Sequence, residues 1–274
     1  MSALAAQVAG GIAPIRISCP NTPASHDDEM SVRTERRGGV AVVTLDQPPA
    51  NAMDAVGLQE LAATVDELTS DDAVTAIVIT GAGRVFSAGL DLKAITGLDD
   101  AGQEELIEAL NRAFLAVYGC PKLVVAAING HAIAGGLVLA LCCDVRLVTD
   151  APVRAALAEV SVGVAFPAGA MEVVRHEVIG AAARRLVLRG ETIDAATAAT
   201  LGVFDRVVPA VDLIDAAVTE ALDNRPPLGA ARIKAQLREP ALTPMRAALD
   251  GHDPVPRPWL TVETMTAATA ALRR

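Results

Sequence analysis

The residues of this chain best suited to chemistry are two adjacent glycines, Gly135 and Gly136, inside its most apolar stretch. Residues 123–144 carry one formally charged side chain, Asp144, and their pattern predicts a buried strand at Leu123–Ile128 and a buried helix from about Gly135. The first N–H groups of a helix have no internal partner, and glycines let a substrate approach them closely. Such a helix start could hold a negatively charged oxygen, although close packing of helix on strand explains the same glycines.

The same stretch is long and apolar enough to be considered as a membrane-spanning helix. We expect it not to be one, because Asn129, Gly130 and His131 interrupt its middle together with the two glycines. A turn at Asn129 and Gly130 is the expected structure there, since an Asn-Gly pair favours the tight turns that end strands.

Three other side chains could take part in chemistry. Glu159 is the one acid in a run of mostly small residues from 152 to 163, but a lone glutamate between a strand and a loop is usually a surface or structural residue. Ser87 and His131 could suggest a hydrolase. That interpretation is disfavoured, because the serine is not in a Gly-x-Ser-x-Gly turn and no spaced His/Asp partner is evident.

The composition limits the classes of partner. The chain has 274 residues, of which 52% are hydrophobic and 20% charged, enough for one large domain with an appended subdomain or for two small domains. Aromatic residues make up only 2%, so the core must be built from Ala, Val, Leu and Ile. The net charge of −10 argues against binding to nucleic acid or to anionic membrane surfaces.

The cysteines and histidines indicate neither disulfides nor a metal site. No Cys-x-x-Cys motif occurs, the four histidines form no ligand pattern, and adjacent cysteines on one helix cannot easily pair. This usage suits a reducing compartment, so we expect a cytoplasmic protein. The start of the chain lacks the basic segment of a secretory signal. The cysteines are Cys19, Cys120, Cys142 and Cys143.

The elements that must position these residues predict an α/β fold. A strand at Val40–Leu45, a helix at residues 55–68 and a strand at 75–80 form a strand–helix–strand unit, which favours a parallel pair. Residues 1–29 lack periodicity and are predicted to be a disordered extension. Further predicted elements are a helix at 104–118, a strand at 145–148, and helices at 169–178, 181–188, 195–200 and 211–222, followed by a mostly helical C-terminus.

Three segments in order resemble the crotonase superfamily, which contains the enoyl-CoA hydratases and isomerases. They are Phe-Ser-Ala-Gly-Leu-Asp-Leu at 86–92, Asn-Gly-His-Ala-Ile-Ala-Gly-Gly at 129–136 and Ala-Glu-Val-Ser-Val-Gly at 158–163, and residues 188–209 are similar to that family as well. The resemblance implies a spiral core of ββα turns over residues 30–209 and a helical C-terminal trimerisation region over 210–274. It also implies a homotrimer or hexamer that binds an acyl-CoA thioester in fatty acid metabolism, with CoA as part of the substrate and no separate cofactor.

The resemblance also implies roles for individual residues. The backbone N–H groups of Leu90 and Gly135 would form an oxyanion hole around the thioester oxygen, where one such donor is typically worth about 3 kcal/mol. The carbonyl of Ala88 would receive the adenine amine, and Arg84 and Lys93 could meet CoA phosphates, although a lone basic loop residue is usually only solvated. The implied substrate-binding set is Ala88, Gly89, Asp91, Leu92, Arg84 and Lys93.

The acid–base residues distinguish the reactions of the family. Hydratases use two glutamates, whose positions fall here on Val138 and Glu159. A valine cannot activate water, whereas one carboxylate with an oxyanion hole is enough to move a double bond from position 3 to position 2. Segments at 48–53, 86–92, 134–136 and 165–167 also resemble the Δ3,Δ2-enoyl-CoA isomerase branch, and the hydratase-type Gly-Gly-Thr segment after residue 163 is absent.

The sequence therefore predicts an enoyl-CoA isomerase with Glu159 as base and acid. A pair of alanines, Ala155 and Ala156, departs from the pattern of many relatives and leaves the acyl chain length open. One alternative is an enoyl-CoA hydratase, lyase or other crotonase chemistry, with an acid from an unmatched residue. The other is a non-catalytic acyl-CoA-binding protein, against which an intact Glu159 argues mildly.

Overall fold

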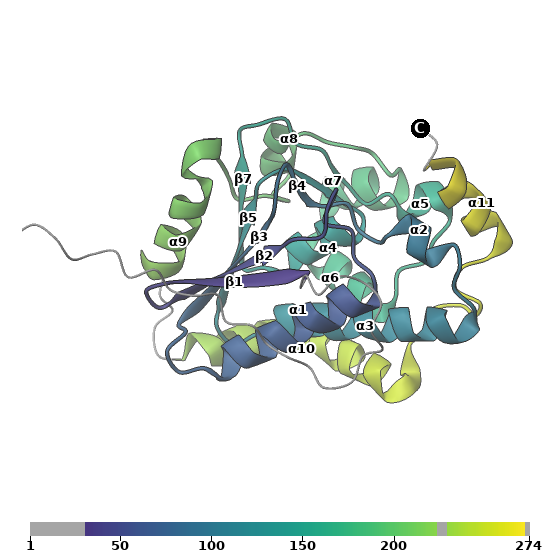
Figure 1. Cartoon of the computed structure of the whole chain (residues 1–274), viewed down its shortest axis with the longest axis horizontal. Coiled ribbons are helices and arrows are strands. Elements are labelled where there is room, and N and C mark those ends of the chain that lie inside the picture. The colour runs from purple at the N-terminus through teal and green to yellow at the C-terminus, as the bar shows by residue number, and fades with distance from the viewer. Residues whose placement is uncertain (1–30, 224–228, 272–274) are drawn as a thin grey trace, which may run out of the picture.

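The computed structural model describes residues 31–223 and 229–271, except for the side chains of Leu92 and Ala271. The predicted disordered extension, residues 1–29, lies outside the described residues. Within them the chain forms an α/β structure in which helices pack on both faces of a main sheet (Figure 1).

The main sheet has six strands in the order β1-β2-β3-β5-β7-β9. β1 and β2 form an antiparallel hairpin, and every later neighbour in the sheet is parallel. The prediction of a parallel pair across the first helix is therefore confirmed by β2 and β3. The strands are β1 (Val32–Arg37), β2 (Val40–Leu45), β3 (Ala76–Gly81), β5 (Leu123–Ile128), β7 (Val145–Thr149) and β9 (Arg206–Val208).

A second, smaller sheet stands beside the first and consists of three short parallel strands in the order β4-β6-β8. Each short strand follows one strand of the main sheet along the chain and leads into helices, which produces repeated ββα turns. This is the spiral arrangement that the family resemblance implies. The short strands are β4 (Val85–Ser87), β6 (His131–Ile133) and β8 (Ala155–Ala156).

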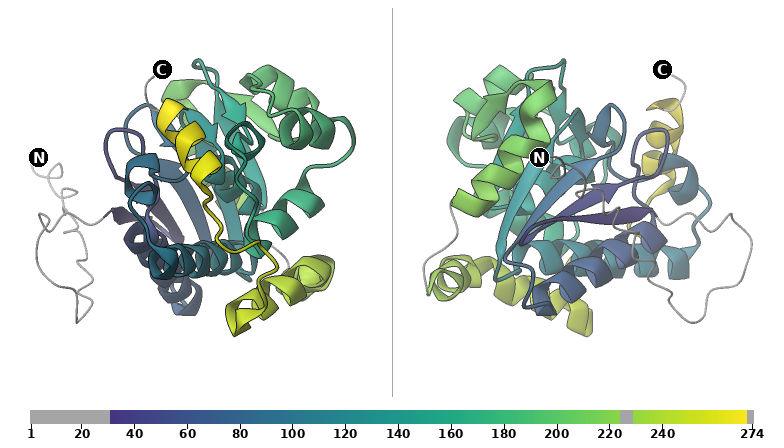
Figure 2. Two further views of the ribbon diagram at one scale, coloured as in Figure 1. Left: turned by 90° about the vertical axis from the view of Figure 1, so that its right-hand side faces the viewer. Right: turned by 60° about the vertical axis from the view of Figure 1, so that its left-hand side comes forward.

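The helices cover the two faces of the main sheet unequally. Alternate residues of β2, such as Val40 and Val42, face α9 in a small apolar cluster, whereas Ala41 and Val43 belong to the large core. Figure 2 shows α9 on one side of the sheet and most other helices on the other. The helices are α1 (Ala55–Ser70), α2 (Leu92–Ile95), α3 (Asp100–Tyr118), α4 (Gly135–Cys142), α5 (Glu159–Val162), α6 (Ala168–Glu177), α7 (Gly180–Ala183), η1 (Arg184–Leu188), α8 (Ala195–Thr200), η2 (Ala210–Asp212), α9 (Leu213–Asp223), α10 (Ala230–Ala247), η3 (Ala248–His252) and α11 (Val262–Ala271).

The predicted elements agree with the structure at most positions. The strands at Val40–Leu45 and Leu123–Ile128 and the helix start at Gly135 are confirmed to the residue. One predicted setting is wrong: Glu159 begins the short helix α5 and does not lie between a strand and a loop. The predicted helix at 181–188 is split into α7 and the π-helical turn η1. The division of the chain near residue 209 stays a prediction.

The apolar stretch that could be considered a membrane helix is instead β5, β6 and the eight-residue α4. Among the described residues, none of the helices has the length and apolarity that crossing a bilayer requires.

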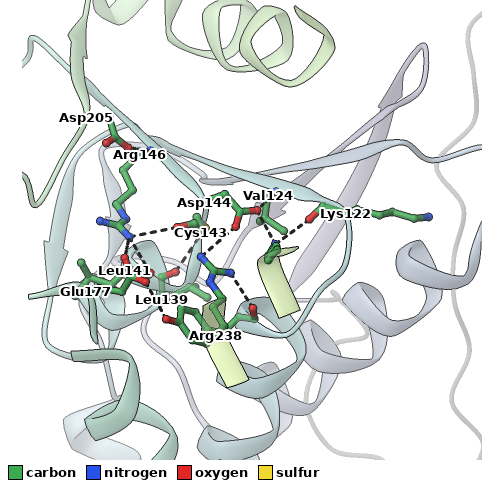
Figure 3. A network of polar contacts seen from close by, with 12 residues as sticks. Lys122, Val124, Leu139, Leu141, Cys143, Asp144, Arg146, Glu177, Asp205 and Arg238 are labelled. Carbon is green, nitrogen blue, oxygen red and sulfur yellow. Dashed lines mark hydrogen bonds and ion pairs between the residues drawn. The ribbon is translucent and has the colours of Figure 1, made fainter. Parts of the chain in front are cut away.

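Asp144, the only charge in that stretch, anchors the C-terminal helices to the core. Its carboxylate accepts the Val124 N–H at 2.8 Å and forms ion pairs with Lys234 at 2.6 Å and Arg238 at 3.0 Å, both from α10 (Figure 3). Arg238 also lies 4.0 Å from the centre of the Tyr118 ring. Asp144 is half-buried, and a carboxylate so far withdrawn from water would be destabilising without partners, so these two cations fix α10 against the C-terminal end of α4.

Candidate active site

The loop after β4 presents the backbone N–H of Leu90. Gly89 accepts the Met53 N–H through its carbonyl at 2.7 Å, and Asp91 donates its own N–H to the Met53 carbonyl at 2.9 Å. This pattern is a parallel bridge between Met53 and Leu90, in which the N–H of Leu90 points away from Met53. In the described part of the chain this N–H has no acceptor.

The start of α4 presents a second N–H, that of Gly135. The preceding residue, Ala134, has φ +52° and ψ −126°, a conformation that costs a residue with a Cβ about 1–3 kcal/mol. Its N–H donates to Ala156 at 2.7 Å, and its carbonyl accepts from Leu137 at 2.9 Å and Val138 at 3.1 Å. The N–H of Gly135 has no acceptor within residues 31–223 and 229–271, so the strained turn holds a free donor at a helix start.

These two donors belong to segments in contact. A Cβ added to Gly89 would lie 2.8 Å from the Ile133 carbonyl oxygen and 3.1 Å from the Gly135 nitrogen. A Cβ on Gly135 would in turn lie 3.8 Å from the Gly89 Cα and 3.0 Å from Met53 Cε. Gly89 also has φ +82°. Two free N–H groups on touching backbone segments form an arrangement that can bind a negatively charged oxygen.

Asn51 holds the turn between β3 and β4 and the start of β4, which precede the Leu90 loop, a role that the sequence did not indicate. Its side-chain amide donates to the carbonyls of Ala82 at 3.0 Å and Val85 at 2.7 Å, and its side-chain oxygen accepts the Gln47 N–H at 3.1 Å. Asn51 is buried and has φ +49°. An asparagine two residues after a pair of prolines was the only signal in the sequence, which does not show which carbonyls the side-chain amide would reach.

Ser87 supports the same loop and is not placed to act as a nucleophile. It is fully buried, and its hydroxyl donates to the Asn51 carbonyl at 2.8 Å while accepting the Gly89 N–H at 3.2 Å. His131 Nδ1 accepts the Arg154 N–H at 3.1 Å, and no hydrogen bond joins it to Ser87 within the described residues. The geometry gives the hydrolase interpretation no support.

Glu159 is the first residue of α5 and carries a carboxyl group withdrawn from water. Its Oε2 is buried and has no hydrogen-bond partner among the residues described. Burial raises the pKa of this carboxyl from 4.5 to about 7, and its own backbone N–H opposes that shift. A carboxyl with a pKa near the working pH is suited both to take up and to return a proton.

Val138 lies fully buried on the first turn of α4, where all eight residues are buried. Its side chain packs in the large apolar core. The helix start that carries the Gly135 donor therefore has no acid at this position, and Glu159 has no carboxylate partner there.

The remaining predicted site residues surround the Leu90 loop. Ala88 is half-buried and donates its N–H to the Ala50 carbonyl at 3.0 Å, while Asp91 caps α2 by accepting the Lys93 N–H at 2.8 Å. The side chains of Arg84 and Lys93 are exposed. Leu92 begins α2, but its side chain lies outside the described part of the structure.

A hollow of about 720 Å³ lies beside these elements, between α11 and the segment that joins α2 to α3. Its lining is mostly apolar, with threonine hydroxyls and one amide. The lining residues are Thr96, Leu98, Gln103, Leu260, Val262, Met265, Thr266, Thr269 and Ala270.

Comparison with known proteins places this geometry in context. Residues 35–253 match the family model for enoyl-CoA hydratase/isomerase. A Mycobacterium tuberculosis protein named probable enoyl-CoA hydratase echA8 is 34% identical over 189 residues, covering 67% of this chain and 71% of its own. The mouse mitochondrial enoyl-CoA delta isomerase 1 is 33% identical over 180 residues, covering 65% of this chain and 62% of its own. The crystal structure of human mitochondrial delta3-delta2-enoyl-CoA isomerase has a TM-score of 0.79 at 25% identity, covering 89% of this chain and 97% of that one.

The raised pKa of Glu159 predicts a stability difference that depends on pH. An unfolded glutamate loses its proton near pH 4.5, but the folded one keeps it until about pH 7, so wild-type stability falls as the pH rises through this window. Glu159→Gln removes the ionisation. We expect this variant to be more stable than the wild type at pH 8, by up to about 3 kcal/mol, with the gain shrinking as the pH approaches 5.

Urea unfolding at both pH values measures this difference. Glu263→Gln, at an exposed position on α11, is the control and should change stability by less than about 0.5 kcal/mol at either pH. Equal stability of wild type and Glu159→Gln at pH 8 would contradict burial of the carboxyl group.

Proposed function

Since the chain belongs to the enoyl-CoA hydratase/isomerase (crotonase) family, we propose that it isomerises 3-enoyl-CoA to 2-enoyl-CoA. Proteins of this family bind acyl-CoA thioesters and act in fatty acid metabolism. The observation that carries the proposal is the Glu159 carboxyl, whose Oε2 is buried without a hydrogen-bond partner among the described residues, with apolar Val138 at the other acid position of the family.

In the proposed reaction the thioester oxygen accepts hydrogen bonds from the N–H groups of Leu90 and Gly135. Glu159 removes a proton from C2, and the electrons of that C–H bond shift toward the thioester carbonyl, giving a dienolate. The two donors stabilise the negative oxygen, each by about 3 kcal/mol. The protonated Glu159 then returns the proton at C4, and the double bond lies between C2 and C3.

Several features support this assignment. A base with a pKa of about 7 is partly ionised at neutral pH and can also act as an acid in the next step. The reaction moves one proton and leaves the oxidation state of the substrate unchanged, so we propose that the enzyme uses no cofactor. The segment from Arg84 to Lys93, which contains β4 and the Leu90 loop, is proposed to hold the CoA part of the substrate. The hollow beside α11 is the proposed place for the acyl chain.

Hydration of 2-enoyl-CoA is the alternative, and the names of the relatives give it weight, since echA8 is named a hydratase. Adding water across the double bond requires activation of the water and protonation of C2, which the family shares between two glutamates. The buried valine at position 138 weighs against this reaction. Binding of acyl-CoA without catalysis is the third possibility, and the raised pKa of Glu159 weighs against it.

A turnover panel separates the three functions. Wild-type protein should convert 3-enoyl-CoA to 2-enoyl-CoA and hydrate 2-enoyl-CoA much more slowly, measured as the gain and the loss of enoyl-thioester absorbance. Glu159→Gln should lower isomerisation by about 10²- to 10⁴-fold, because it removes the proposed base. Its affinity for a saturated acyl-CoA should stay close to that of the wild type, because binding depends on the backbone and the CoA loop.

Val138→Glu supplies the missing acid on the first turn of α4, where the helix dipole favours an anion. We expect measurable hydratase activity in this variant, with lower stability because a carboxylate enters an apolar site. Wild-type hydration as fast as isomerisation would refute the isomerase assignment. Binding without any turnover would favour the non-catalytic alternative.

A pair of glycine substitutions tests the oxyanion hole. Gly89→Ala places a Cβ 3.1 Å from the Gly135 nitrogen and should displace one donor, lowering kcat by about 10²- to 10³-fold. Gly83→Ala is the matched control, because Gly83 also has a positive φ, +70°, but a Cβ there would meet nothing within 4 Å. The control should lose some stability and keep its kcat. Similar kcat values for both variants would argue against the two donors.

We also propose a homotrimer or hexamer in the cytoplasm. The exposed apolar side chains of Ile233 and Leu237, which are 64% and 76% accessible one helical turn apart on α10, support self-association. The free and buried cysteines Cys120, Cys142 and Cys143 suit a reducing compartment. Light scattering at micromolar concentrations should give three or six chain masses, and a monomeric mass would refute the oligomer.

A further inference from the structure

The segment from Asp253 to Thr264, here called the C-terminal strap, runs from the end of η3 to the first turn of α11 (Figure 2, left, yellow). Its first residue is firmly anchored. The Asp253 carboxylate accepts hydrogen bonds from the Asn111 side-chain amide at 2.6 Å and from the Ala168 N–H at 3.0 Å, at the start of α6. Prolines at 254, 256 and 258 then restrict the strap backbone before it reaches α11.

The middle and end of the strap contact the loop that follows α5. Trp259, the only tryptophan of the chain, is buried and donates its indole N–H to the Ala165 carbonyl at 2.7 Å. Thr264 is also buried and donates its hydroxyl to the Gly163 carbonyl at 3.3 Å. Between them, Leu260 donates its N–H to the buried side chain of Gln103 at 2.8 Å. The strap therefore holds two carbonyls of residues 163–165.

The same loop holds the main chain of Glu159. Gly163, in the left-handed region with φ +71°, donates its N–H to the Glu159 carbonyl. Val164 donates its N–H to that carbonyl as well, at 3.0 Å. Gly163 therefore makes both a strap contact and a hydrogen bond to Glu159, and Ala165, which accepts from Trp259, directly follows Val164. A helix of four residues has little internal stability, so its position depends on such contacts.

We propose that Trp259 and Thr264 are positioning residues for Glu159: the C-terminal strap fixes the loop at 163–165 and thereby the depth at which α5 holds the carboxyl group. This inference rests on the proposed role of Glu159 as the base. It explains why a carboxyl group with one unpartnered oxygen stays buried on a helix of a single turn. Loosening the strap would let the group reach water.

The charged groups near α5 do not account for the raised pKa of Glu159. Of the elements packed against α5, α11 carries Glu263 and η1 carries Arg184 and Arg185. Arg185 is paired with Glu191 at 2.5 Å, and Glu263 is exposed. Burial is the main cause of the raised pKa of Glu159, so a looser strap should lower that pKa toward 4.5.

Two conservative substitutions test the strap in the full-length protein. Trp259→Phe removes the indole N–H and keeps an aromatic ring, while Thr264→Val removes the hydroxyl and keeps the shape. We expect the lower pH midpoint of kcat/KM for isomerisation to fall by about one unit in either variant. At pH 8 kcat should fall about tenfold, with KM changed less than about threefold. Thr200→Val is the control, because this exposed threonine on α8 also donates its hydroxyl to a backbone carbonyl, 2.9 Å away.

A role confined to stability would lower the melting temperature and leave the pH midpoint unchanged. If both variants keep the pH midpoint and the kcat of the wild type, the inference is overturned. If Trp259→Phe does not fold, the result for Thr264→Val decides. Amide hydrogen exchange of residues 163–164 gives a readout that needs no activity, and it should accelerate at least about tenfold in the variants. Unchanged exchange at residues 163–164 would overturn the proposed role of the strap. A wild-type protein without isomerase activity refutes the proposed function, and the exchange result still tests the strap.

Discussion

The contact between the β4 segment and the β6–α4 segment is the constraint on which the rest of the site depends. Three glycines allow it: a Cβ on Gly130 would lie 1.8 Å from the Arg84 carbonyl oxygen, and one on Gly136 would lie 2.3 Å from that of Ser87. Gly89 meets the start of α4 in the same way. Because side chains are missing where the segments touch, two backbone donors can lie at one place. A chain with so few aromatic residues builds its core on such close approaches.

The second constraint is that the site keeps polar groups without hydrogen-bond partners, which lowers the stability of the fold. Free N–H groups and a carboxyl without a full set of partners are groups that folding normally satisfies. Here Leu90, Gly135 and Glu159 keep such groups, and Ala134 adds an unfavourable backbone conformation. Surrounding hydrogen bonds from Asn51 and other residues over-determine this arrangement and keep it in place. These unsatisfied groups are consistent with a site that completes its hydrogen bonds only when a substrate is bound.

Contacts from the C-terminal part of the chain hold the elements around Glu159 in place. Asp144 pairs with Lys234 and Arg238 and so fixes α10 beneath α4, and the strap then returns from Asp253 across the loop that follows Glu159. These contacts join residues that are 85 or more positions apart in the sequence. The environment of the candidate base therefore depends on a segment that carries none of the motifs.

The sequence alone determined the order of the elements and the helix start at Gly135, because hydrophobic periodicity and glycine-rich turns are local properties. The candidate roles of Glu159 and Leu90 came from the family resemblance of the motifs around them. The strand at Leu123–Ile128 and the helix start at Gly135 could be predicted to the residue from local sequence patterns. The roles of Asn51 and Trp259 could not, since each acts through carbonyls that lie far away in the chain. Burial of the Glu159 carboxyl was likewise decided only by the tertiary structure, because desolvation depends on everything packed around a group and not on its neighbours in sequence.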